Sequence, residues 1–289
     1  MRTRILNKMT NAEVEAYLQR NDVIFVPVGT VETHGVFGVD AETVIPEAIA
    51  QRLAEKADGI ALSGLPYFFC GATTEARSSV QMSVSAGVEY LRELAVSLLK
   101  QGFRRQVWIG GHAPGFLQLG TLVNDLFHET GAPISYLAGA GMPKPQSTGG
   151  AAPAHSWVKG INLLTLGAYT VLGRLDEVLI DPEVAFEDSF EANILPDDEV
   201  SSYSYLFHFG PLSGQVGFYQ NRPQCHFTFY GAARSQQELL KYSEIGRQML
   251  EEGVGDFDIR GYLEELRALD RQACEARLAV NHLSTSLWQ

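Results

Sequence analysis

Residues 23–50 read VIFVPVGTVETHGVFGVDAETVIPEAIA, and this stretch decides the fold. Its first residues, 23–28, are apolar and rich in β-branched side chains, a composition typical of a strand buried on both faces. Gly29 ends the strand. A helical pattern follows over about 44–57, with Pro46 near its start, where a missing N–H is tolerated best. The stretch therefore predicts a buried strand, a polar loop and a helix.

The loop between this strand and this helix contains Glu32, His34, Asp40 and Glu42. In an open α/β sheet, ligands bind beyond the carboxyl ends of the strands, which is where this loop begins. Carboxylates crowded there repel one another unless they are protonated or neutralised by a cation, and oxygen and nitrogen ligands suit zinc or manganese. The loop therefore predicts a divalent metal site. A solvated polar loop is the alternative that these residues alone leave open.

Strand and helix patterns alternate along the rest of the chain. We predict helices over about 11–19, 44–57, 88–100, 116–129, 162–172, 236–251 and 257–279, and strands over 23–28, 59–65, 106–109, 133–137 and 226–230, with a short edge strand at 80–84. This alternation predicts a parallel sheet with helices on both faces. No internal repeat and no clear domain boundary is visible, so we expect a single domain over residues 1–289, with the helices at about 236–279 packing on it.

A histidine follows a second buried strand at the matching position. Gly110, Gly111 and His112 come directly after the strand predicted at 106–109. Two parallel strands that end in glycine-rich loops with metal-ligating side chains can converge at one point of a sheet. A Gly-Gly-His turn alone is more often structural, but its place beyond a strand favours a shared site with Glu32 and His34.

The composition is that of an ordinary soluble globular protein, with 45% hydrophobic and 19% charged residues. A net charge of −12 disfavours nucleic acid and anionic membrane surfaces as partners. The three cysteines are far apart and form no CxxC pattern, which fits a reducing cytoplasm. The first 15 residues contain no apolar h-region, and no stretch reaches 18 apolar residues, so we expect a cytoplasmic protein.

The blocks PVGTVETHG, TVIPEAIAQRLAEK and LRELAVSLLKQGFRRQVWIGGH together resemble the creatininase (creatinine amidohydrolase) family. The family pattern is a strand, Glu-x-His-Gly, an Asp before the next helix, and later Asn-Gly-His. The resemblance is best over residues 10–137. It implies a three-layer α/β/α fold with a mainly parallel central sheet, commonly assembled as hexamers, so we expect a homo-oligomer. It also implies metal-dependent hydrolysis of an amide, often cyclic, with zinc or manganese.

By this resemblance, Glu32, His34 and His112 match the metal ligands of the family. Aligned from the helix TVIPEAIA, the bridging Asp of the family is replaced by Glu42, with a one-residue deletion in the loop. Asp40, two residues earlier, is the alternative bridging ligand. We prefer Glu42 because the helix alignment needs fewer gaps.

Several positions depart from the family pattern. Phe37 stands near the place of a second His, Gly110 replaces Asn, and Pro114 stands where creatininase has a Glu that completes a second metal site. The later motif His-Ala-Gly-Glu-x-Glu should fall near residue 155, where the chain reads HSWVKG and keeps only His155. These departures predict one firmly held metal and a second that is weak or absent.

The resemblance predicts hydrolysis of a small cyclic amide by a metal-activated water. Glu32, Glu42 and His112 would hold the metal, and His34 would be a ligand of a second metal or a hydrogen-bond donor beside the first. His155, at the end of a long Gly-, Ala- and Pro-rich loop, would pass a proton to the leaving group. Two alternatives remain open: hydrolysis of a ring C–C bond in a keto-inositol, and a non-catalytic family member.

Overall fold

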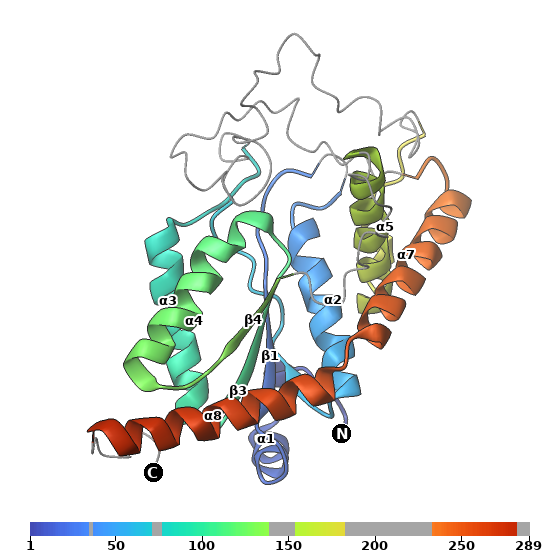
Figure 1. Cartoon of the computed structure of the whole chain (residues 1–289). Coiled ribbons are helices and arrows are strands. Elements are labelled where there is room, and N and C mark those ends of the chain that lie inside the picture. Colours follow the sequence, from blue (N-terminus) through green and yellow to red (C-terminus); the bar gives the residue numbers. More distant parts are fainter. Residues whose placement is uncertain (35–36, 71–76, 139–153, 183–232, 282–289) are drawn as a thin grey trace.

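The computed structural model describes residues 1–34, 37–70, 77–138, 154–182 and 233–281 (Figure 1). The helices are η1 (Leu6–Lys8), α1 (Asn11–Leu18), α2 (Ala41–Lys56), α3 (Val84–Lys100), η3 (Ala113–Gly115), α4 (Phe116–Thr130), α5 (Ala154–Leu172), η4 (Leu175–Glu177), α7 (Gln236–Asp256) and α8 (Ile259–Asn281). The strands are β1 (Val23–Val28), β2 (Ile60–Ala61), β3 (Arg105–Gly110) and β4 (Ser135–Ala138).

The described strands form a parallel sheet in the order β2-β1-β3-β4, as the alternation of strands and helices predicts. The two central strands are β1 and β3, and every residue of both is buried. Their register pairs Val23 with Arg105 and Val28 with Gly110, so both strands end at the same level. The loops that follow β1 and β3 therefore start side by side.

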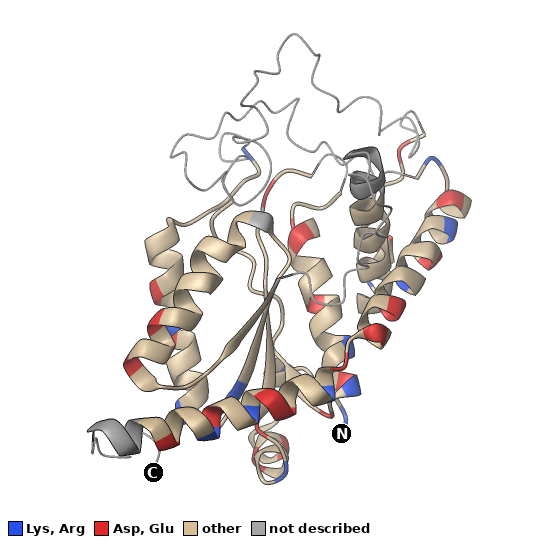
Figure 2. Cartoon of the chain, in the orientation of Figure 1, with Lys and Arg blue, Asp and Glu red and all other residues tan. Residues whose placement is uncertain are grey.

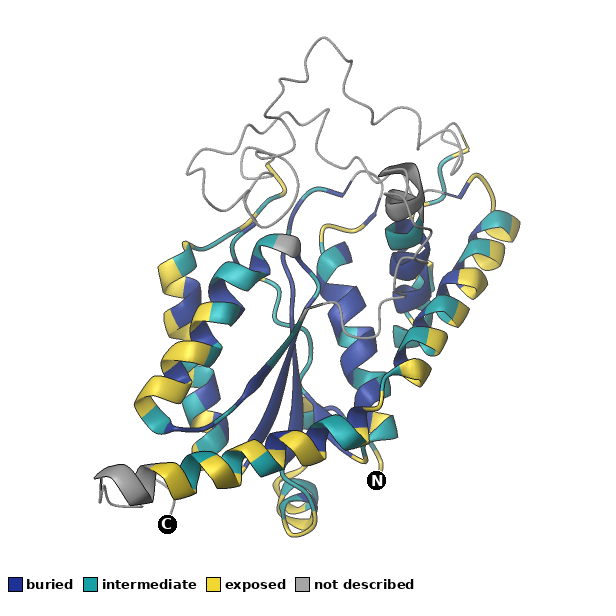
Figure 3. Ribbon diagram, in the orientation of Figure 1, coloured by how far each residue is buried: buried dark blue, intermediate teal, exposed yellow. Residues whose placement is uncertain are grey.

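Helices cover both faces of the sheet, which confirms the three-layer α/β/α prediction (Figure 1). The side chains of β1 alternate between the two layers. Phe25 packs with α2, α5 and α7 on one face, and Ile24 packs with α3 and α4 on the other. Trp108 of β3 is fully buried in the second layer. Figure 3 shows that burial is concentrated in the strands and on the inner sides of the helices.

Several segments differ from the prediction. Helix α2 begins at Ala41, one turn earlier than expected, so Pro46 lies inside the helix rather than at its start. The edge strand expected at 80–84 is wrong: Val80 makes one antiparallel bridge with Val31, and Val84 already begins α3, whose N-cap Ser83 accepts from the backbone N–H of Ala86. Ser83 thus favours helix over strand by satisfying a free N–H.

Helix α5 begins at Ala154 instead of 162, so His155 lies in its first turn and not in a loop. The strand expected at 226–230 lies outside the described residues.

The C-terminal helices contact the N-terminal part of the chain. Helix α7 packs closely on α5, where a Cβ placed on Gly167 would lie 2.2 Å from the backbone of Gly246. Helix α8 crosses the edge of the sheet at the amino ends of the strands, with charged residues along its outer side (Figures 1 and 2). Lys56 of α2 donates to the carbonyls of Val254 and Phe257 at the end of α7. The single domain over residues 1–289 stays a prediction.

Among the described residues, no helix is both long enough and apolar enough to cross a lipid bilayer.

Candidate metal centre

The ends of β1 and β3 bring the predicted site together. Glu32 and His34 follow β1, and His112 follows β3. The first turn of α2 closes against both strand ends: a Cβ on Gly29 would lie 2.6 Å from the carbonyl oxygen of Glu42, and so would a Cβ on Gly111. Glycine is therefore required at both positions, because any side chain would push away the helix that carries Glu42.

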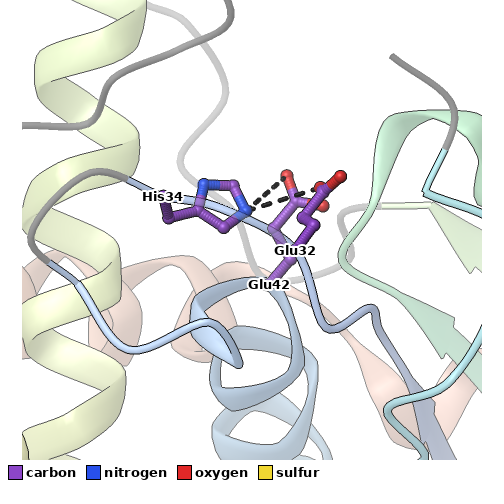
Figure 4. Close-up of side chains that lie close together, drawn as sticks. All are labelled: Glu32, His34 and Glu42. Atoms are coloured by element: carbon purple, nitrogen blue, oxygen red, sulfur yellow. Dashed lines mark ion pairs between the residues drawn. The ribbon is translucent and has the colours of Figure 1, made fainter. Parts of the chain in front are cut away.

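The side chains of Glu32, His34 and Glu42 point toward one another (Figure 4), and one ligand atom from each lies within 4.8 Å of the others. His34 Nε2 is 3.4 Å from Glu32 Oε1 and 3.9 Å from Glu42 Oε1. His112 joins from β3, with Nδ1 3.2 Å from Glu32 Oε1 and in contact with Glu42 Oε2. Two carboxylates and two imidazoles thus share one small volume.

The cluster is almost sealed from solvent. Glu32 is 1% exposed, His34 2% and His112 8%. The side chain of Glu42 is 19% exposed, so it is the most open member of the cluster.

Burial and charge act against each other on these groups. Burial raises the pKa of Glu32, but its interactions with His112 and His34 outweigh burial and hold the pKa well below the ordinary value. Burial raises the pKa of Glu42, and the charge of Glu32 adds to the effect, although His112 offsets part of it. Burial lowers the pKa of His112, but the carboxylates of Glu42 and Glu32 outweigh it and raise the pKa well above the ordinary value. Without a metal, a proton on His112 balances part of the negative charge.

The donor set fits a divalent metal. Carboxylate oxygens and imidazole nitrogens are ligands of zinc and manganese in proteins, and two buried carboxylates this close require a positive charge. His112 Nε2 is buried, and no hydrogen-bond partner lies near it among the described residues. A metal in place of the His112 proton would neutralise the cluster.

Asp40 lies outside this cluster. It precedes the first turn of α2, where its Oδ1 accepts from Tyr169 Oη at 2.8 Å and its Oδ2 pairs with Arg174 Nη2 at 2.7 Å. Both of its carboxylate oxygens are therefore engaged by residues of α5 and the turn that follows. His155 lies in the first turn of α5.

Two residues with buried polar side chains were not predicted. Thr30 Oγ1 lies between the two carboxylates, 3.4 Å from Glu32 Oε1 and 3.3 Å from Glu42 Oε2. Its place two residues before Glu32 was the signal available in the sequence. Asn162 of α5 is 1% exposed, and neither atom of its amide has a hydrogen-bond partner among the described residues. No sequence signal marks it, because helical polar residues are usually exposed.

The positions that depart from the family pattern have structural roles here. Phe37 is 5% exposed and belongs to the hydrophobic core that includes α2 and α5. Pro114 lies in the short helix η3, directly after His112, and brings no carboxylate to the cluster.

A small pocket borders the centre on the α4 side. Its lining residues are mostly apolar or glycine, with His112, Thr30 and Gln118 as the polar members: Val28, Gly29, Thr30, Phe68, Phe69, Gly110, His112, Gly115, Gln118 and Leu119. The amide of Gln118 is buried and accepts from the backbone N–H of Phe69 at 3.4 Å.

Known proteins resemble this chain in sequence and in fold. A curated relative, 3-dehydro-scyllo-inosose hydrolase from Thermotoga maritima, is 28% identical over 115 residues, which span 38% of this chain and 36% of that protein. The solved structures "Creatininase Mn" and a mutant creatininase of "Zn-Zn type" are each 18% identical, with TM-scores of 0.56 and 0.57. The first covers 88% of this chain and 97% of its own, and the second 89% and 97%.

The match to a family model covers more of the sequence than the match to the curated relative. Residues 7–157 match the Creatininase family, described as creatinine amidohydrolase. This range includes β1, β3 and all four residues of the cluster. The chain therefore belongs to the creatininase family, whose members are hydrolases.

Proposed function

We propose that this protein is a metal-dependent amidohydrolase that cleaves the C–N bond of a small cyclic amide. The observation that carries the proposal is the buried cluster of Glu32, His34, Glu42 and His112 at the ends of the two central strands. Family membership supports the reaction class, and the solved creatininases with zinc and manganese support the choice of metal.

We assign Glu32, Glu42 and His112 as ligands of zinc or manganese, with His34 beside them. Such an ion lowers the pKa of a bound water and polarises a carbonyl oxygen. The protein residues prepare this site in two ways. Thr30 lies between the two carboxylates and orients both, and the burial of Glu32 and His112 keeps bulk water away from them.

Cleavage of an amide also needs a proton for the leaving nitrogen. We assign this role to His155 on the family resemblance, and we keep His34 as the second candidate because it already lies beside both carboxylates. An imidazole changes its protonation state near neutral pH, which suits proton transfer.

A second candidate function is hydrolysis of a ring C–C bond in a keto-inositol. The observation that favours it is the relative named 3-dehydro-scyllo-inosose hydrolase, at 28% identity over 115 residues. A hydroxyl-rich ring would need polar partners, and the buried amide of Gln118, which lines the pocket beside His112, is such a group.

One panel of assays separates the two functions. The chelator-treated protein is reloaded with zinc or manganese and incubated with creatinine, other lactams, cyclic ureas and a keto-inositol. Turnover of a cyclic amide that depends on the metal, and that Glu42→Gln abolishes, supports the amidohydrolase. Turnover of the keto-inositol alone supports the second function. A protein that retains no metal after dialysis and turns over nothing contradicts both.

A further inference from the structure

Backbone hydrogen bonds join the two ends of the loop that carries Glu32 and His34. In its described parts, residues 32–34 and 37–40, the backbone N–H of Glu32 donates to the carbonyl of Val39 at 2.9 Å. The N–H of Phe37 donates to the carbonyl of His34 at 3.1 Å. The position of the two metal-binding residues therefore depends on where the far end of the loop, next to Asp40, is held.

That far end is held by α5 and the turn after it. Asp40 accepts from Tyr169 Oη at 2.8 Å through Oδ1 and pairs with Arg174 at 2.7 Å through Oδ2. Phe37 packs in the same hydrophobic core as Tyr169. A Cβ on Gly38 would lie 2.8 Å from Tyr169 Oη and 2.9 Å from Asp40 Oδ1, so glycine leaves the space that this hydrogen bond needs.

The two partners of Asp40 are themselves rigidly placed. The ring of Tyr169 is buried in the core, with 1% of the residue exposed. The guanidinium of Arg174 lies 5.4 Å from the centre of this ring and donates to both carboxylate oxygens of Glu177 at 2.9 Å. Helix α5, which carries Tyr169, packs against both α2 and α7. The contacts of Asp40 with Tyr169 and Arg174 therefore link the loop to a fixed part of the protein.

We propose that Asp40, Tyr169 and Arg174 form a clamp that positions the metal-binding residues without contacting the metal. We call these three residues the α5 clamp. Asp40 stands two residues before Glu42 and one residue after Val39, whose carbonyl binds Glu32. The clamp thus acts on both carboxylates of the cluster at once. It is the kind of support that partners outside the ligand set give to a metal site.

The physical reason is the repulsion within the cluster. The ligand atoms of Glu32, Glu42 and His34 lie within 4.8 Å of one another. At this distance the like charges of the two carboxylates push the loop that carries Glu32 away from helix α2, which carries Glu42. The clamp opposes this motion before the metal binds, so less ordering is left for the binding step. Without it, the protein still folds, but the ligands are less often in the binding geometry, and the apparent metal affinity falls by the same fraction.

The inference rests on the proposed metal site, and its test uses metal affinity rather than turnover. Zinc and manganese affinities of the full chain are measured by competition with a chelator for Tyr169→Phe, Arg174→Gln and the double variant. We expect each single variant to bind either metal about tenfold more weakly, as substitutions outside the ligand set usually do. We expect the double variant to be little worse than either single variant, because both remove one clamp. Arg174→Lys, which keeps the charge, should recover part of the affinity.

Two control variants separate positioning from general loss of stability. Tyr17→Phe removes a buried tyrosine hydrogen bond to the carbonyl of Val23, at the opposite end of β1. Arg247→Gln removes an exposed arginine that pairs with Glu244 on α7. Thermal unfolding is measured for all variants without metal, and both controls should keep the wild-type metal affinity even where they unfold at a lower temperature.

The results that would overturn the clamp are distinct from those that would overturn the metal site. Wild-type affinity in both Tyr169→Phe and Arg174→Gln, with lower unfolding temperatures, means that the contacts are only structural. Loss of metal in Asp40→Asn alone means that Asp40 is itself a ligand. A wild-type protein that binds neither metal refutes the proposed function, and the clamp with it.

Discussion

Replacing Glu42 by glutamine should change stability in opposite directions with and without metal. The substitution keeps the shape of the side chain and removes one of two carboxylates in a buried cluster. Without metal, this charge is unfavourable in the folded protein, because burial and the charge of Glu32 raise the pKa of Glu42 above its ordinary value. The neutral variant should therefore be more stable than the wild type when no metal is present.

The size of the gain follows from the geometry. Charges no more than 4.8 Å apart, as in this cluster, repel by at least about 3.5 kcal/mol at an effective dielectric constant of about 20. The variant also avoids burying an ion, which costs several kcal/mol, and it loses the attraction to His112. The net gain should be roughly 1–3 kcal/mol in the free energy of unfolding, which corresponds to an increase of about 2–10 °C in Tm.

With metal present, the wild type should gain more stability than Glu42→Gln. A zinc concentration of about 100 times the Kd stabilises the wild type by about 2.7 kcal/mol. If Glu42 is a ligand and its loss weakens binding about 100-fold, the same zinc concentration stabilises Glu42→Gln by only about 0.4 kcal/mol. Asp40→Asn should behave differently, because it breaks the contacts to Arg174 and Tyr169. Its metal-free stability should fall by about 1 kcal/mol. The tenfold weaker binding expected without the clamp should leave about 1.4 kcal/mol of the zinc effect.

The assay is urea unfolding of chelator-treated protein, with and without added zinc, for the wild type and both variants. Glu55→Gln on the exposed side of α2 is the matched control and should stay within about 0.5 kcal/mol of the wild type. The reasoning is refuted if Glu42→Gln is less stable than the wild type without metal, or if it keeps the full zinc effect. If Asp40→Asn alone loses the zinc effect, Asp40 and not Glu42 is the ligand.

Three further predictions concern pH, metal content and assembly. The pKa of His112 is raised above its ordinary value of 6.5, so the stability that its charge provides is present below pH 6.5 and is lost as the pH rises through the raised pKa. The metal-free protein should therefore unfold more easily as the pH increases above 6.5, whereas the stabilisation by zinc should increase, because zinc displaces the proton. Unfolding series with and without zinc that run in parallel would contradict this. Elemental analysis after dialysis should find one equivalent of metal per chain, because Pro114 brings no carboxylate for a second ion, and two retained equivalents would contradict this. Light scattering should show a closed homo-oligomer, as the family resemblance suggests, and a monomer mass independent of concentration would exclude it.

Local patterns in the sequence were enough to predict the parts of the fold that depend on neighbours along the chain. The run of apolar, β-branched residues at 23–28 predicted β1 with both ends correct. The positions of Glu32, His34 and His112 directly after buried strands predicted a shared site, because the carboxyl ends of parallel strands lie at one edge of a sheet. The start of α2 was placed one turn too late, because Pro46 was taken to mark the start of a helix that extends before it.

The choice between Asp40 and Glu42 shows what the sequence left open. Both are acidic, they are two residues apart, and both stand at the start of one helix, so local chemistry does not distinguish them. The structure separates them through contacts with distant residues: Asp40 meets Tyr169 and Arg174, 129 and 134 positions away, and Glu42 meets His112, 70 positions away. Which side chain faces the site depends on the rotation of α2 about its axis, and that rotation is determined by the packing of α2 against the sheet and α5.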